Sequence, residues 1–239
     1  MAEMEMAAAG AELPAGEARD FSVSLLSLPG SVAKWPLAMK FLRLRKDVFI
    51  DQMNWGLFHA EGVEFEQYDS IGVTYVVAHR AEQVIGGARL VCTTNSFGSG
   101  EFVYTYMIRD ACRGLLANMP TGLCAGEPPV SGKIWELTRL VAIKEPGIAE
   151  AILASSNRFL HAIAAEQCLF LGPPAFMRMA KRMGFSPSPL GDIQGNVDGR
   201  FLAFSCDVIP PEEVVEYART SGASPALSRQ ACPASSPSR

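Results

Sequence analysis

Residues 133–143, with the sequence KIWELTRLVAI, form a long apolar run that is typical of a buried strand. A stretch of good helix formers follows at 149–167, and a second, shorter apolar run follows at 168–171. A strand, a helix and another strand in this order favour an α/β fold.

The chain on either side of this stretch predicts further elements of both kinds. The expected strands cover residues 21–28, 72–79, 84–92 and 200–208. The expected helices cover residues 36–52, 107–118 and 173–183. Because some strands form hairpins and others are separated by helices, we expect a mixed, mainly antiparallel sheet with helices on both faces.

The composition is that of one globular domain. The 239 residues are 49% hydrophobic and 19% charged, which excludes disorder of the whole chain. The predicted domain covers residues 21–210. We expect residues 1–20 to form a mobile arm, and residues 211–239 to form a short helical or disordered tail.

Charge and cysteine content exclude several classes of function. The net charge of −4 gives no electrostatic reason to expect a nucleic-acid partner. No apolar run is long enough to span a membrane, and the acidic N-terminus is unlike a secretory signal. The six cysteines and three histidines lack metal-ligand spacing, so we expect a cytoplasmic, metal-free protein with free thiols.

Polar and aromatic residues at helical spacing mark the first candidate site. Arg45 and Phe49 are four residues apart, so they share one helix face, and Trp55 follows just after the helix. These residues are suited to line a cleft. The same spacing also fits a core phenylalanine, a half-buried tryptophan and a solvated arginine.

An acidic run, Glu64–Asp69 with the sequence EFEQYD, precedes the strand at 72–79. Three acids within six residues are suited to bind a cationic group. A solvated loop has the same composition.

Charged residues inside apolar strands mark the third candidate site. Arg89 lies in the strand at 84–92, while Glu136 and Arg139 lie in the strand at 133–143. Burying such charges is costly unless they are paired. Residues three apart point to opposite faces of a regular strand, so either a bulge re-aims one of them or they serve different faces. A purely structural ion-pair network is the alternative.

Taken in order, these motifs resemble one known family. Arg45-x3-Phe49-x5-Trp55, Glu66-Gln67-Tyr68-Asp69, Arg89-Leu90 and Trp135-Glu136-Leu137-Thr138-Arg139 resemble the signature of the acyl-homoserine-lactone synthases, the LuxI-type autoinducer synthases. The resemblance covers about residues 21–208. The element order likewise resembles the GNAT acyltransferase fold.

The resemblance implies a cytoplasmic acyltransferase with two substrates, S-adenosyl-L-methionine and an acyl thioester of acyl carrier protein or coenzyme A. The acyl group passes to the amine of S-adenosylmethionine. The carboxylate then closes onto the γ-carbon, which releases 5′-methylthioadenosine and an N-acyl-homoserine lactone, a quorum-sensing signal. No cofactor or metal is implied.

The resemblance also suggests roles for the motif residues. Glu136 is a candidate general base, and backbone N–H groups near Thr138 and Arg139 are candidate oxyanion donors. Glu66 and Asp69 offer negative charge to the cationic substrate. The remaining candidates are aromatic faces from Phe49 and Trp55, a carboxylate-binding guanidinium from Arg45 or Arg139, and Arg89 to hold the acids.

Two further groups of residues are candidates for the acyl donor. Phe102, Met107, Phe176 and Met177, with Met183, are candidates to line the acyl pocket, although core packing is the favoured role for each. Arg178, Lys181 and Arg182 share one helix face, which is either a docking surface for the carrier protein or coenzyme A, or a plain solvated face.

The sequence departs from the family pattern at two places. Glu66 stands where the family usually has aspartate, and the stretch 93–131 is longer than usual. Two other functions remain open at this point: an N-acyltransferase that forms no lactone, and a non-catalytic sensor of S-adenosylmethionine or acyl groups.

Overall fold

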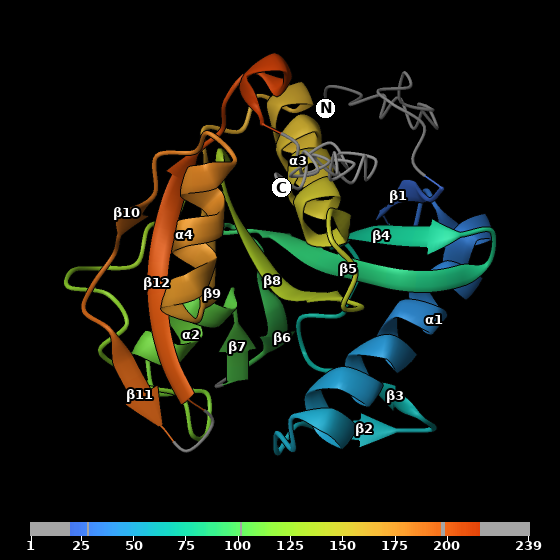
Figure 1. Cartoon of the computed structure of the whole chain (residues 1–239). Coiled ribbons are helices and arrows are strands. Elements are labelled where there is room, and N and C mark those ends of the chain that lie inside the picture. Colours follow the sequence, from blue (N-terminus) through green and yellow to red (C-terminus); the bar gives the residue numbers. More distant parts are fainter. Residues whose placement is uncertain (1–19, 28, 101, 197–198, 216–239) are drawn as a thin grey trace, which may run out of the picture.

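A computed structural model describes residues 20–27, 29–100, 102–196 and 199–215. Its centre is an eight-stranded sheet of order β1-β4-β5-β8-β9-β12-β10, with β11 paired to β12 (Figure 1). The strands are β1 (Ser22–Ser27), β4 (Thr74–Arg80), β5 (Gln83–Cys92), β8 (Ile134–Ala142), β9 (Gln167–Gly172), β10 (Ser188–Pro189), β11 (Gln194–Asn196) and β12 (Gly199–Asp207). All neighbouring strands are antiparallel except β8 and β9.

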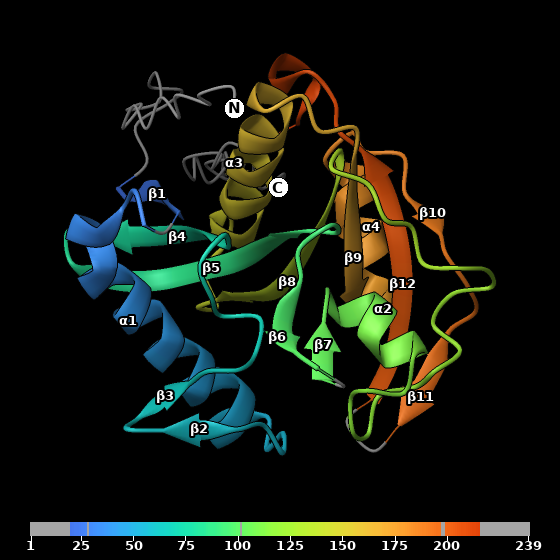
Figure 2. The same ribbon diagram turned by 180° about the vertical axis from the view of Figure 1, so that it is seen from behind.

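Helices cover both faces of the sheet (Figures 1 and 2). One face carries α1 (Trp35–Arg45), which continues into the π-helical turns of η2 (Lys46–Gln52), and the short α2 (Met107–Cys112). The other face carries α3 (Ile148–Ala162) and α4 (Pro174–Arg182). The smaller elements are η1 (Val32–Lys34), η3 (Pro211–Glu213) and the hairpins β2 (His59–Ala60) with β3 (Val63–Glu64) and β6 (Phe97–Ser99) with β7 (Phe102–Tyr104).

Two adjacent glycines let helices approach β5 from opposite faces. A Cβ at Gly87 would lie 2.7 Å from the Phe41 ring of α1. A Cβ at Gly86 would lie 3.0 Å from Ile148 and Ile152 of α3. Both distances are too short for a side chain, so the close packing of α1 and α3 on β5 depends on glycine at these positions.

The middle of β8 is irregular in two ways. Arg89 of β5 pairs with Thr138 and Gly87 pairs with Val141, so β8 contains one extra residue between them. Arg139 occupies this bulge with a φ of 54°. In addition, the recorded pairing with β9 ends at Leu137 and Phe170. The bulge re-aims one side chain, and the end of pairing leaves main-chain groups of β8 without a β9 partner.

The mixed, mainly antiparallel sheet predicted from the sequence is confirmed. The helix predicted over 107–118 ends at Cys112, because the chain turns at Gly114 with a φ of 72°. The helix predicted over 149–167 ends at Ala162, before Ala164 with a φ of 55°. The short strands β2, β3, β6, β7, β10 and β11 were not predicted.

The predicted arm and tail lie largely outside the described residues, which include only Asp20 of the arm and residues 211–215 of the tail. Within the described part of the chain, no helix has the length and apolar character needed to cross a membrane.

Candidate active site

Three arginines and three acids form a buried group on the sheet face that carries α1. This ionic cluster consists of Arg45, Glu64, Glu66, Asp69, Arg89 and Arg139. Its members come from α1, from β3 and the loop after it, from β5 and from the bulge of β8. Three guanidiniums thus face three carboxylates, so the burial of each charge is offset by opposite charges.

Arg45 and Asp69 form the deepest pair of the ionic cluster. Nη1 and Nη2 of Arg45 donate to the two carboxylate oxygens of Asp69 at 2.8 and 2.9 Å. The Arg45 guanidinium also binds the carboxylate of Glu64. All three side chains are fully buried. The predicted role of Arg45 in binding a substrate carboxylate does not fit this arrangement, because its guanidinium is already engaged by two acids.

Arg89 joins the deep pair to the rest of the ionic cluster. Its Nη2 donates to Glu66 at 2.6 Å and its Nε donates to the Thr138 hydroxyl at 3.2 Å. Its Nη1 lies 3.0 Å from Oδ1 of Asp69, although the angle there is not that of a hydrogen bond. Arg89 therefore holds both acids, as predicted from its place in an apolar strand.

The rim of the ionic cluster is formed by Glu66 and Arg139. Nη2 of Arg139 donates to Glu66 at 2.8 Å, and its Nε donates to Glu64 at 3.2 Å. These two rim side chains are 14% and 8% exposed, whereas the side chains of the other four members are fully buried. A ligand that approaches the ionic cluster therefore meets Glu66 and Arg139 first.

Burial and neighbouring charges shift the pKa values of Asp69 and Glu66 in opposite directions. Burial alone would raise the pKa of Asp69, but Arg89 and Arg45 hold this pKa well below its usual range. Burial likewise opposes the lowering of the Glu66 pKa by Arg139 and Arg89. Both carboxylates are therefore ionised at neutral pH.

Two aromatic rings adjoin the rim. Phe49 and Trp55 are stacked, with ring centroids 5.1 Å apart and an interplanar angle of 6°. The Arg139 guanidinium lies over the Phe49 ring, 5.8 Å from its centroid. Phe49 is in the π-helical turns of η2, a type of distortion often found at functional sites. Phe49 is buried and Trp55 is half-buried, as in the alternative interpretation of this motif, whereas Arg45 is buried and not solvated.

Glu136 is fully buried and holds the start of α2. Its carboxylate accepts the backbone N–H groups of Met107 at 2.9 Å and Ile108 at 2.7 Å. Burial raises the pKa of Glu136 to about 7, although these two N–H groups act in the opposite direction. A carboxylate with this pKa is suited to exchange protons at neutral pH.

Residues that the sequence analysis did not select support the same region. Asp110 of α2 accepts hydrogen bonds from the Tyr68 hydroxyl at 2.8 Å and from both the N–H and the hydroxyl of Thr105. The Tyr75 hydroxyl donates to Asp69 at 2.9 Å. The hydrogen bond between Asp110 and Tyr68 thus connects the acidic run to α2, the helix whose first N–H groups bind Glu136.

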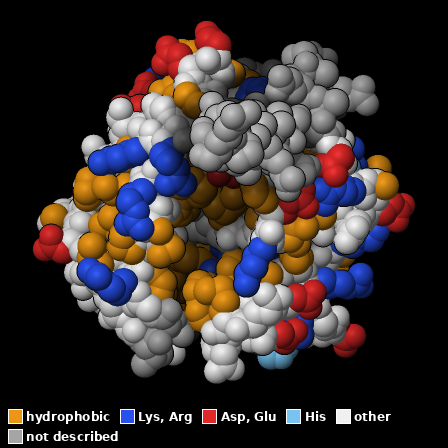
Figure 3. Space-filling model, in the orientation of Figure 1, with side chains coloured by type: hydrophobic (Ala, Val, Ile, Leu, Met, Phe, Trp, Pro, Cys, Tyr) orange, Lys and Arg blue, Asp and Glu red, His pale blue; other side chains and the backbone are white. Residues whose placement is uncertain are grey.

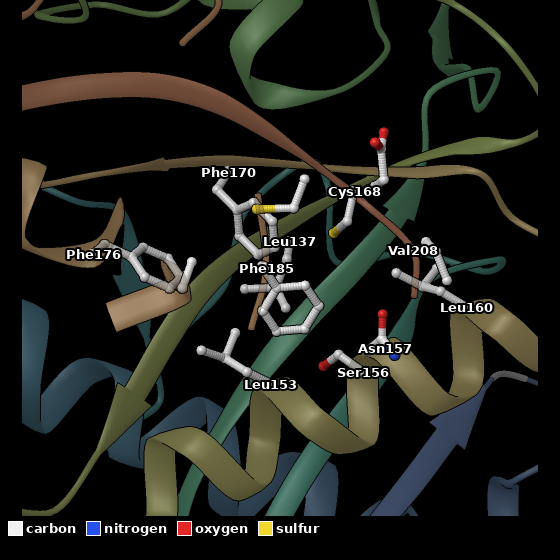
Figure 4. A pocket seen from close by; sticks show the side chains of 13 residues that line it. Leu137, Leu153, Ser156, Asn157, Leu160, Cys168, Phe170, Phe176, Phe185 and Val208 are labelled. Carbon is white, nitrogen blue, oxygen red and sulfur yellow. The ribbon is translucent and has the colours of Figure 1, made fainter. Parts of the chain in front are cut away.

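A narrow apolar pocket lies on the opposite sheet face, between α3 and α4 (Figure 4). Leu137 and Phe170, where the pairing of β8 and β9 ends, are among its lining residues. Phe176 also lines it, and Met177 packs against the same core; their role in an acyl pocket stays a prediction. Met107 does not line this cavity: it begins α2 and lies beside Glu136. Phe102 begins β7, and its side chain is outside the described part.

The face of the molecule that carries α4 combines apolar and basic side chains. Figure 3 shows a central hollow with hydrophobic side chains around it, and a group of Lys and Arg side chains over α4. The predicted basic residues Arg178, Lys181 and Arg182 are all exposed on α4.

Comparison with known proteins agrees with this geometry. The family model described as autoinducer synthase matches residues 36–145, which contain the ionic cluster and Glu136. An acyl-homoserine-lactone synthase of Acinetobacter nosocomialis is 28% identical over 183 residues, covering 71% of this chain and 90% of the relative. Over these residues the chain is similar to the autoinducer synthase family.

Solved structures share the fold of this protein. The CoA-dependent acyl-homoserine-lactone synthase BjaI, solved with SAM and isopentyl-CoA, superposes with a TM-score of 0.67 at 20% identity, covering 79% of this chain and 84% of BjaI. A Lactobacillus plantarum protein described as a candidate N-acetyltransferase superposes with a TM-score of 0.50 at 10% identity, covering 79% of this chain and 99% of that one. The GNAT-like fold predicted from the element order is confirmed.

Proposed function

We propose that this protein is an autoinducer synthase, which makes an N-acyl-homoserine lactone from S-adenosyl-L-methionine and an acyl thioester. The observation that carries the proposal is the position of β8 between two different surfaces. Arg139 reaches the charged and aromatic rim on one face, and Leu137, two residues earlier, lines the apolar cavity on the other. The main chain at Thr138 is thus the point where an amine held at the rim and an acyl group held in the cavity meet.

S-adenosylmethionine suits the rim by charge and shape. Its ammonium and sulfonium are cations that Glu66 attracts, and its carboxylate suits the guanidinium of Arg139. Trp55, the more exposed ring of the stacked pair, suits either the adenine ring or the sulfonium. The four fully buried members of the ionic cluster then serve to position Glu66 and Arg139.

The acylation step needs a base and a site for the oxyanion. Glu136 takes a proton from the substrate ammonium, directly or through a water, and the free amine attacks the thioester carbonyl. Main-chain N–H groups at Thr138 and Arg139, beyond the last recorded β9 pair, are suited to stabilise the tetrahedral oxyanion. Collapse of this intermediate forms the amide and expels the thiol.

The second step closes the lactone ring. An oxygen of the substrate carboxylate attacks the γ-carbon, the carbon–sulfur bond breaks, and neutral 5′-methylthioadenosine leaves. The sulfonium already activates this leaving group, so the protein's contribution is positioning by Arg139. Because both substrates arrive activated, we propose that no bound cofactor or metal is required.

The donor is a thioester whose acyl chain occupies the apolar cavity. Arg178, Lys181 and Arg182 on α4 are suited to the acidic surface of acyl carrier protein or to the phosphates of coenzyme A. We place the reaction in the cytoplasm, because the five cysteines of the described part are free thiols, as expected in a reducing compartment.

A product assay tests the proposal. The purified protein is incubated with S-adenosylmethionine and a panel of acyl-coenzyme A and acyl-carrier-protein thioesters, and thiol release and methylthioadenosine release are followed together. We expect both to appear in equal amounts with an N-acyl-homoserine lactone. Thiol release without methylthioadenosine contradicts lactone synthesis and indicates a plain N-acyltransferase, and binding of S-adenosylmethionine without turnover indicates a sensor.

A further inference from the structure

Two cysteines that the proposed reaction does not use lie close together at the surface. Cys112 is the last residue of α2, and Cys124 lies in the loop between α2 and β8. Both are partly exposed and line the same solvent-open pocket of about 710 Å³. The two thiols interact electrostatically with each other and with Tyr106.

The local backbone allows the two sulfur atoms to approach further. An S–S bond requires the two sulfur atoms to come within about 2.05 Å of each other. Cys124 lies between Gly122 and Gly126, in a segment of turns and bends without regular structure. A Cβ at Gly126 would meet no atom within 4 Å, so the chain has open space on this side of Cys124.

The other described cysteines are shielded from reagents in solution. Cys168 and Cys206 face each other across β9 and β12, but they are only 5% and 2% exposed. Cys92 is 9% exposed. Accessibility therefore distinguishes Cys112 and Cys124 from the remaining described thiols.

The charges around the pocket favour an anionic reagent. Arg109 and Arg113, four residues apart, both line it, and Glu127 is the acid in its lining. Arg109, and Arg113, which also pairs with Asp110 at 3.5 Å, can donate guanidinium N–H groups to a small molecule that carries carboxylates.

We propose that Cys112 and Cys124 are a redox-active dithiol that an acidic low-molecular-weight disulfide, of the glutathione class, oxidises to an intramolecular disulfide. The thiolate of Cys112 attacks one sulfur of the reagent, forms a mixed disulfide and expels one reagent thiolate, which takes up a proton. Cys124 then loses its proton, attacks the Cys112 sulfur and expels the second reagent thiolate. The protein dithiol is oxidised to a disulfide, and the reagent disulfide is reduced to two thiols.

The order of attack follows from burial, which raises the pKa of Cys124 to about 12. Cys124 is therefore protonated at neutral pH and is the poorer first nucleophile. The proposal does not rest on lactone synthesis, because the exchange uses only the two cysteines and the reagent.

Peptide mapping after treatment with glutathione disulfide tests the proposal. The protein carries Cys232→Ser, which removes the cysteine outside the described residues from the exchange. Trypsin cleavage after Arg109, Arg113 and Lys133 gives peptides 110–113 and 114–133, which contain Cys112 and Cys124 as their only cysteines. We expect these two peptides to be linked, two thiols to be lost together from alkylation, and dithiothreitol to restore both.

Variants separate the two steps. Cys124→Ser should stop at a mixed disulfide on Cys112, and Cys112→Ser should give no linked peptides. Cys92→Ser is the matched control and should keep the link. The proposal is overturned if the treated protein carries only mixed disulfides, if both cysteines remain open to alkylation, or if either is linked to a different cysteine.

Discussion

Replacing Glu136 by glutamine should stabilise the folded protein at pH 8 while it slows acyl transfer. The carboxylate is fully buried, and burial raises its pKa to about 7. The unfolded chain binds this proton with an ordinary pKa of 4.5. At a pH between 4.5 and about 7, the folded state keeps a proton on Glu136 that the unfolded state has lost. The unfolding free energy of the wild type therefore falls as the pH rises through this range.

The size of the effect follows from the two pKa values. The rise from 4.5 to about 7 corresponds to about 3 kcal/mol, lost as the pH rises from below 4.5 to above 7. A glutamine at this position resembles the protonated acid and does not titrate. The difference in unfolding free energy between Glu136→Gln and wild type should therefore move by about 3 kcal/mol in favour of the variant over this pH range.

Chemical denaturation of both proteins at pH 4.5 and pH 8 measures this difference. Glu212→Gln, which alters an exposed glutamate, is the matched control and should show no such change with pH. Acyl transfer by Glu136→Gln should be slower by about 10²–10⁴-fold, the usual contribution of general-base catalysis.

The opposite stability result would refute this reasoning. If Glu136→Gln loses stability relative to wild type as the pH rises, the ionised carboxylate is a net stabilising cap for the N–H groups of Met107 and Ile108. Unchanged turnover in the variant would assign proton removal to another group or to solvent.

Three further substitutions test other parts of the structure. Trp55→Ala should weaken S-adenosylmethionine binding, measured by calorimetry, at least about tenfold and thioester binding little, because the stacked ring adjoins only the rim. Phe58→Ala, at a 70% exposed position, is the control, and an equal loss of affinity for both ligands would contradict the assignment. Asp110→Ala should cost about 3 kcal/mol in denaturant unfolding, since three buried donors lose their acceptor, and a loss below about 1 kcal/mol would rule out that role. Ala81→Gly should raise the unfolding free energy by about 0.5–1 kcal/mol, because Ala81 has a φ of 48° in the β4–β5 turn, whereas destabilisation would show that this strain is absent.

Periodicity and the cost of buried charge predicted much of the fold and of the site. Arg89 lies in an apolar strand, so it required an acid, and Glu66 and Asp69 supply that partner. The sequence left open whether Glu136 and Arg139 serve one face or two. A bulge resolves this question, and its register depends on pairing with β5, which local sequence does not encode.

The roles of other site residues could not be predicted from the sequence. The acidic run contains three acids, and nothing in its sequence indicates that Glu64 is fully buried against Arg45 while Glu66 lies at the rim. Asp110 is one acid in a short helix, and its role depends on Tyr68, 42 residues earlier. Such contacts are set by tertiary packing, which also positions the short strands β2 and β3.

One labelling experiment tests the synthesis of a lactone at this site most directly. S-adenosylmethionine labelled with ¹³C in its carboxyl carbon and ¹⁵N in its amine is incubated with the protein and its best acyl thioester. The account predicts that both labels appear in the product, with ¹⁵N in the amide and ¹³C in the ring carbonyl, and that methylthioadenosine is unlabelled. A product with ¹⁵N in the amide and the adenosyl group still attached would contradict lactone formation, and thioester hydrolysis with both labels left in S-adenosylmethionine would contradict acyl transfer.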